Sequence, residues 1–134
     1  MAVKDSLPKA YIELPWDDET SVLIPAARSD MERVRREGPA MVERYSDAGK
    51  LTPEEEDALV RESLAFFCGE DVGERLYTMA LEYIGRGLPG SECAEQMVAV
   101  VELVAQAWED HLTEDAERRG RIAARYLGDG DDAI

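Results

Sequence analysis

The sequence predicts a mainly α-helical protein: a small domain of four to six helices with an N-terminal β-hairpin. Three observations favour this fold class. A long apolar stretch, residues 91–112, carries a helical stripe; two short N-terminal segments are rich in strand-forming residues; and several segments open with a helix-capping signal. The 134 residues suit one domain. We expect it to cover residues 1–128, with the hairpin at about 11–25, the helices at about 29–127 and a frayed tail at 129–134.

The predicted central helix has the sequence SECAEQMVAVVELVAQAWEDHL. Ser91 is placed to cap its N-terminus. Its main apolar residues recur at spacings of four, three and four, which puts them on one helical face. They are Met97, Val101, Val104 and Trp108, and the face is widened by Ala94, Val98 and Ala105. Because this stripe is broader than a coiled-coil seam, we expect it to form the centre of the core.

The predicted hairpin consists of two five-residue segments, Tyr11–Pro15 and Ser21–Pro25. They are joined by an acidic turn in which Asp17 and Asp18 can accept hydrogen bonds from nearby backbone. An isolated hairpin is only marginally stable in water. This hairpin must therefore pack on the helices of its own chain or pair with a strand of another chain.

Two short helices are predicted after the hairpin. The first covers residues 29–37, where Ser29 and Glu32 have capping-box spacing, and the Gly38-Pro39 step ends it. The second covers residues 40–48 and is expected to turn three side chains inward: Met41, Val42 and Tyr45.

The next helix has the clearest start signal in the chain. Thr52 is the expected N-cap, Pro53 takes the first helical position and Glu55 occupies the capping-box position. The acidic run that follows belongs at the positive end of a helix dipole. The helix should end at Gly69, after a core face made of Leu59, Leu64, Phe66 and Phe67.

A further helix is predicted over residues 70–85, with Asp71 and Glu74 at capping-box spacing. Gly73 lies in its first turn, where glycine costs about 1 kcal/mol relative to alanine. A close approach of another backbone would explain that glycine. The expected core face comprises Leu76, Met79, Ala80, Tyr83 and Ile84.

Beyond residue 112 the helix either restarts, with Thr113 and Asp115 or Glu117 as its cap, or runs straight on. A thin apolar stripe of Ile122, Tyr126 and Leu127 lies beside four arginines: Arg118, Arg119, Arg121 and Arg125. Because the stripe is narrow, this segment should pack back on the domain or dock on a partner. The arginines face either the protein's own acidic surface or that partner.

The formal net charge of −15 argues against binding to nucleic acid or to an anionic membrane, since both need clustered positive charge. It suits high solubility or a basic protein partner. The two cysteines, Cys68 and Cys93, form no metal-binding or redox motif and are expected to be small buried residues in a reducing compartment. We find no signal peptide or spanning segment, and expect a cytoplasmic protein.

No catalytic, cofactor-binding or metal-binding motif is present in the sequence, and we predict that the protein is not an enzyme. The single histidine, His111, is more typical of a helix terminus than of a ligand. Two Glu-x-x-Glu pairs keep one enzyme alternative open, because such pairs bind Mg²⁺ in some all-α nucleotide pyrophosphohydrolases. They are Glu92 with Glu95 and Glu114 with Glu117, and both would have to point into the core.

The order of these parts resembles the tail assembly chaperones of long-tailed bacteriophages and prophages. Their sequences often run from a strand segment ending in Ile-Pro, here Ile24-Pro25, into helices. They then carry an F-x-x-x-G-E-like step, here Phe66-Phe67-Cys68-Gly69-Glu70, before a helix pair and a charged C-terminal tail. The resemblance extends from Tyr11 to about Leu127, and the chain departs from the pattern at Gly73 and in its glycine-rich segment 85–90.

The resemblance implies a non-enzymatic protein, without a cofactor, that binds the tape measure protein and keeps it soluble while tail tube subunits polymerise around it in the host cytoplasm. The tail tube protein is a second implied partner, and self-association is an option. The residues we expect to contact a partner are Trp16, Phe66, Phe67, Arg118, Arg121 and Arg125. A small acidic inhibitor, resembling an antitoxin, is the remaining alternative, because the chain is strongly acidic.

Overall fold

The computed structural model describes residues 10–46, 51–85 and 90–128, and the expected tail at 129–134 lies outside them. The described residues are mainly helical, with an N-terminal two-stranded antiparallel hairpin, as the sequence predicts. The elements are β1 (Tyr11–Pro15), β2 (Ser21–Pro25), α2 (Arg28–Ser46), α3 (Pro53–Cys68), α4 (Glu70–Ile84), α5 (Gly90–Ala123) and a short π-helical segment, η2 (Ala124–Gly128).

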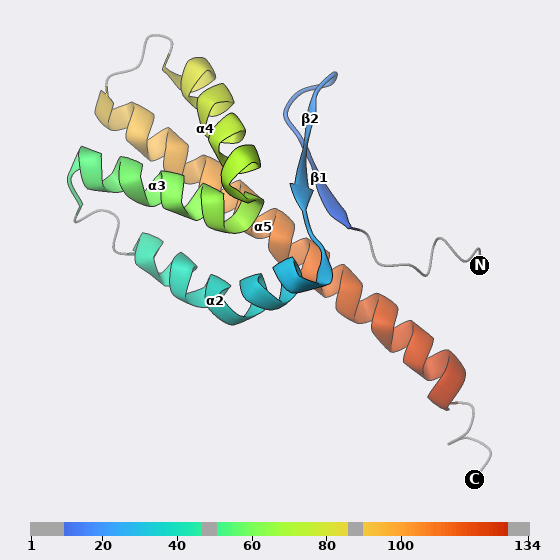
Figure 1. Cartoon of the computed structure of the whole chain (residues 1–134). Helices are drawn as coiled ribbons and strands as arrows, with labels where there is room; N and C mark the ends of the chain where they lie inside the picture. The colour runs from blue at the N-terminus through green and yellow to red at the C-terminus, as the bar shows by residue number, and fades with distance from the viewer. Residues whose placement is uncertain (1–9, 47–50, 86–89, 129–134) are drawn as a thin grey trace.

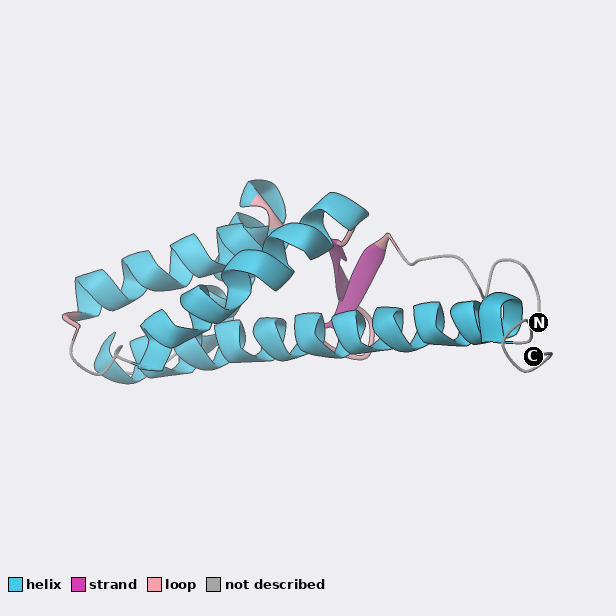
Figure 2. Ribbon diagram, turned by 90° about the horizontal axis from the view of Figure 1, so that it is seen from below, coloured by secondary structure: helices cyan, strands magenta, loops and turns pink. Residues whose placement is uncertain are grey.

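Helix α5 extends along one side of the molecule, and the other helices all pack on the same side of α5 (Figure 2). Its N-terminal half packs against α3 and α4, which also pack against each other. Helix α2 crosses near the middle of α5, and the hairpin contacts α5 through β1 and α4 through β2 (Figure 1). The C-terminal part of α5 projects beyond all of these elements (Figures 1 and 2).

The core lies where these elements meet. The predicted face of the central helix is confirmed, since all four main residues, Met97, Val101, Val104 and Trp108, are buried. The hairpin contributes its alternate side chains, Ile12, Val22 and Ile24, and therefore packs on the helices of its own chain. No helix among the described residues is both long and apolar enough to cross a membrane.

Neither outer edge of the hairpin pairs with another strand among the described residues, and each edge is ended by a proline. The bonds that flank the ladder, from Ala26 N–H to Ala10 and from Trp16 N–H to Thr20, set which backbone groups face the partner strand. By alternation, the odd-numbered residues of both strands turn their backbone groups outward. Pro15 and Pro25 occupy such positions, so neither edge has a donor at its last residue.

Helix α2 corrects the prediction of two short helices. It is one helix of 19 residues that passes through Pro39. A residue before proline normally avoids the helical conformation because its Cβ and N–H clash with the proline ring. Gly38 has no Cβ, which relieves part of that clash. The predicted Ser29 cap is also wrong, because the Asp30 carboxylate instead accepts the N–H of Ala27, 3.0 Å away, before the first turn.

The expectation that Met41, Val42 and Tyr45 turn inward is confirmed only in part. Met41 is partly buried against the core, as predicted. Val42 is not turned inward: it is 50% exposed. The side chain of Tyr45 lies outside the described residues.

Helix α3 begins as predicted. The Thr52 hydroxyl accepts the Glu55 N–H and the Glu55 carboxylate accepts the Thr52 N–H, both at 3.2 Å. Gly69 ends the helix with φ of +85°, a conformation that favours glycine. The predicted core face is largely confirmed, since three of its residues, Leu59, Leu64 and Phe67, are buried and Phe66 is partly buried.

Helix α4 differs from its prediction in two respects. Gly69 is its N-cap and there is no side-chain cap bond, so the proposed Asp71–Glu74 capping box is wrong. Tyr83 is 71% exposed, whereas Tyr77 is buried in its place and donates its hydroxyl to Asp57 of α3. Gly69 has no side chain that could cap the helix, and the packing of α4 on α3 buries Tyr77 in place of Tyr83.

Helix α5 continues past residue 112 without a break, which settles the alternative left open by the sequence. Asp115 is not the cap of a new helix but a buried carboxylate within α5. The continuous helix carries its arginines out onto the projecting part of the molecule (Figure 1).

Candidate functional site

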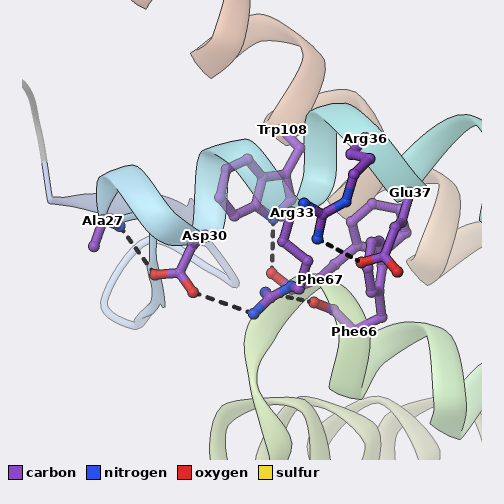
Figure 3. Close-up of polar contacts among 8 residues, drawn as sticks. All are labelled: Ala27, Asp30, Arg33, Arg36, Glu37, Phe66, Phe67 and Trp108. Carbon is purple, nitrogen blue, oxygen red and sulfur yellow. Dashed lines mark hydrogen bonds and ion pairs between the residues drawn. The ribbon is translucent and has the colours of Figure 1, made fainter.

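The C-terminal end of α3 is the joint on which the candidate site is built. The last carbonyl groups of a helix have no partner within the helix. Here side chains from two other helices supply partners: Arg33 of α2 donates to the Phe66 carbonyl at 2.8 Å, and Trp108 of α5 donates to the Phe67 carbonyl at 2.7 Å (Figure 3). The joint therefore fixes α2 and α5 relative to α3.

Arg33 is held from two further sides. Its guanidinium bonds the Asp30 carboxylate at 3.3 Å and lies over the Phe66 ring, 5.4 Å from the ring centroid (Figure 3). The positive charge also suits the negative end of the α3 dipole. Phe66 is thus engaged within the domain through both its carbonyl and its ring.

A mostly apolar groove runs between α2 and α5 above this joint. Its volume is about 770 Å³. Phe67 and Trp108, both buried, lie at its base. The remaining apolar wall comes from both helices: Val34, Pro39 and Val42 of α2, with Ala105, Leu112 and Ala116 of α5. Such a groove is the shape that accepts the apolar face of an amphipathic helix.

The α2 wall depends on the helix continuing through Pro39. Val34, Gly38 and Val42 are spaced by four residues and therefore share one helical face. Pro39 has no N–H, so the Arg35 carbonyl cannot receive its usual helical bond from that residue. The sequence contained this spacing of four, but a predicted break at proline concealed it.

The rim of the groove is charged. Glu102 and Glu109 line it on the α5 side, and both are exposed. Arg35 lines it on the α2 side and faces Asp115, with 3.8 Å between the Arg35 Nη2 and Asp115 Oδ2 atoms. An occupant of the groove would therefore meet carboxylates along α5.

Asp115 connects α2 to the second half of α5. Its carboxylate is 2.6 Å from Arg118 and 3.1 Å from Arg119, besides its contact with Arg35. Burial acts to raise the pKa of Asp115, but the hydrogen bond from Arg118 and the charges of all three arginines outweigh it and hold this pKa below its usual value. The carboxylate therefore stays ionised at neutral pH.

The six residues predicted to contact a partner do not form one surface. Phe67 lines the groove. Trp16 lies elsewhere, with its ring edge-on to Tyr83 and 6.1 Å between ring centroids. Phe66 contacts Arg33, and Arg118 contacts Asp115. Arg121 and Arg125 are exposed on the projecting end of α5 and in η2. That these residues contact a partner stays a prediction.

A second, more polar hollow lies between β1 and α5. Its volume is about 430 Å³, and Glu13, Asp110, His111 and Glu114 contribute to its lining. The His111 ring lies edge-on to Trp108, with 5.9 Å between centroids. Among the described residues, no group of three or more histidine, cysteine, aspartate or glutamate side chains is arranged to hold a metal ion.

The glutamate pairs and the Cys68 thiol do not form a reactive site among the described residues. Glu95, Glu114 and Glu117 are exposed, and the side chain of Glu92 lies outside the described residues. Burial raises the pKa of the Cys68 thiol to about 12, so this thiol stays protonated at neutral pH and is a poor nucleophile. What the described geometry offers is a surface for binding, and its main feature is the α2–α5 groove.

We compared the chain with known proteins, and no family model, no curated protein and no solved structure matches it.

Proposed function

We propose that this protein is a non-enzymatic assembly chaperone of the phage tail type, which binds an amphipathic helix of a tape measure protein and keeps it soluble. The observation that carries the proposal is the apolar groove between α2 and α5. A long helical client exposes apolar stripes before assembly, and an open, mostly apolar groove can cover one of them.

The charge of the chain supports the same role. A net charge of −15 keeps the loaded complexes apart in solution. Glu102 and Glu109 on the groove rim would favour a client helix with lysine or arginine beside its apolar stripe. The order of parts along the sequence, which resembles tail assembly chaperones, supports the tape measure protein as the client.

The enzyme alternative has less support. A Mg²⁺ site built from the two Glu-x-x-Glu pairs requires both pairs to face the core. Glu114 and Glu117 are instead exposed. The groove itself is mostly apolar, which suits a protein helix better than a nucleotide phosphate.

The test is co-expression with a phage tape measure protein, followed by size-exclusion chromatography with light scattering. We expect the wild-type protein to keep that partner soluble and to co-elute with it. Val42→Arg should weaken the complex at least about tenfold, because it places a charge on the apolar wall, where about 1.4 kcal/mol corresponds to a factor of ten. Val42 is half exposed, so the fold should tolerate the change.

Leu103→Arg is the matched control. Leu103 is 64% exposed on α5 and does not line the groove. The same new charge there should leave the complex intact. Equal effects of the two variants, or a partner that stays insoluble beside the wild-type protein, would contradict the proposal.

A further inference from the structure

The groove face of α5 continues along the projecting part of the same helix. Five of the α5 residues that line the groove share one face, at spacings of three, four, three and four, the pattern of a coiled-coil seam. They are Glu102, Ala105, Glu109, Leu112 and Ala116. The same spacing leads on to Arg119 and Ala123, which we include in the seam; beyond Ala123 the wider π winding changes the spacing.

The seam is complementary to itself when two copies run antiparallel. A two-fold axis near residue 114 places Leu112 of each copy against Ala116 of the other. The same axis places Glu109 against Arg119, an acid against a base, and Ala105 against Ala123, which lets the helices approach closely. A relation of this kind needs no other partner, because both halves of the contact lie on one helix.

Arg119 is placed to serve as the cation of that pair. Its Nε atom contacts Asp115 of its own helix at 3.1 Å, and its side chain is half exposed. The two Nη groups of a guanidinium point away from Nε and can reach a second carboxylate. Glu109, on the groove rim, supplies an exposed carboxylate at the matching position of the other copy.

The charge of this region also permits two copies to approach. Residues 109–128 carry five acidic and four basic side chains, so their net charge is −1, although the whole chain carries −15. Repulsion between two copies that meet over residues 109–128 is therefore much weaker than the net charge of the whole chain implies.

Among the described residues, the projecting part of α5 has several exposed side chains on the seam side. Ala116, Arg119 and Ala123 are exposed, and a Cβ added at Gly120 would meet nothing within 4 Å. A helix without packing is marginal in water. The seam from Ala105 to Ala123 spans about 27 Å at 1.5 Å per residue, long enough for two copies to support each other's projecting ends.

We propose that a second copy of this chain occupies the α2–α5 groove: two copies pair antiparallel through α5, and each inserts its projecting end between α2 and α5 of the other. Val42 and Pro39 of α2 then close over the inserted helix. The dimer proposal depends only on the spacing of the seam residues and on their charges. Only a corollary rests on the proposed function, namely that a client helix and a second copy compete for one groove.

Sedimentation velocity on the full chain, from about 1 to 200 µM, tests the dimer. We expect a monomer–dimer equilibrium in this range for the wild-type protein. Ala123→Glu should weaken dimerisation at least about tenfold, because it inserts a bulky carboxylate against Ala105 beside the acidic rim. Ala124→Glu is the control: it adds the same charge one exposed residue further on, off the seam, and should dimerise like the wild type.

A charge exchange tests the register. Arg119→Glu should weaken the dimer by opposing Glu109, and adding Glu109→Arg to that variant should restore it, since both variants share the lost Asp115 contact within the chain.

A wild-type protein that stays monomeric at 200 µM overturns the proposal, and so do equal effects of the two alanine variants or a double variant no better than Arg119→Glu. A monomer that still holds the tape measure helix leaves the proposed function standing, whereas a dimer that never binds it removes that function alone.

Discussion

Gly73 determines how closely α4 can approach α3. A Cβ at this position would lie 2.7 Å from the Leu64 carbonyl oxygen and 2.9 Å from the Ala65 nitrogen, distances that real Cβ atoms do not adopt. These neighbours are backbone atoms of α3 and cannot rotate away. A glycine in a first helical turn predicted a close backbone approach, and that expectation is confirmed. The identity of the approaching backbone depends on tertiary packing and could not be predicted from the sequence.

Gly73→Ala should therefore lower the free energy of unfolding by about 1–3 kcal/mol, the usual cost of overpacking, even though alanine favours helix. Gly120→Ala is the matched control, because an added Cβ there meets no atom within 4 Å. That variant should raise stability by up to about 1 kcal/mol. Urea unfolding followed by circular dichroism measures both, and similar shifts in the two variants would show that the α3–α4 contact is not tight.

At the scale of an element, α2 shows how one residue changes a helix boundary. The Gly38-Pro39 step predicted two helices, yet Gly38 lets one helix continue and brings Val42 onto the groove wall. The other end of the groove is held by Asp115, whose arginine partners come from both α2 and α5. From the sequence, Asp115 was a candidate for a helix cap. A local sequence pattern cannot predict its contact with Arg35, which lies 80 residues away in the chain.

Asp115→Asn should remove the ion pairs and keep the shape of the side chain. We expect a loss of about 1–2 kcal/mol at pH 7, less than for a fully buried pair, because two of the arginines are half exposed. The pKa of Asp115 is lowered in the native state. Its contribution is therefore fully present above the usual aspartate pKa of about 3.9 and is lost as the pH falls through the lower native value.

Thermal melts of the wild-type protein and Asp115→Asn between pH 7 and pH 3 measure that contribution. The difference between the two midpoints should shrink at the acidic end. A difference that stays constant over the whole range would mean that the ionised carboxylate contributes nothing and that only its shape matters.

At the scale of the whole molecule, one helix of 34 residues belongs both to the core and to the surface. Its length corresponds to about 51 Å. The sequence could predict the buried stripe, since Met97 to Trp108 is a local pattern. It could not predict the groove, whose two walls come from distant segments, or separate Phe67, which lines it, from Phe66, which does not.

Hydrogen exchange should separate the two parts of α5. In Ala123→Glu, measured as a monomer, amides near Val101 and Val104 should exchange slowly, since these residues lie in the core. Amides from about residue 117 onward should exchange rapidly. In the concentrated wild-type protein the same distal amides should become at least about tenfold slower, and equal rates in both samples would mean that this helix end gains no support from another copy.

The two prolines at the hairpin edges restrict the forms in which this protein can accumulate. A cross-β fibril grows by adding strands to an open edge, and each added strand needs a continuous row of donors. Each edge of this hairpin offers donors at two outward positions and then ends at Pro15 or Pro25. The two prolines therefore shorten the donor row at both edges and hinder the growth of a sheet from the native hairpin.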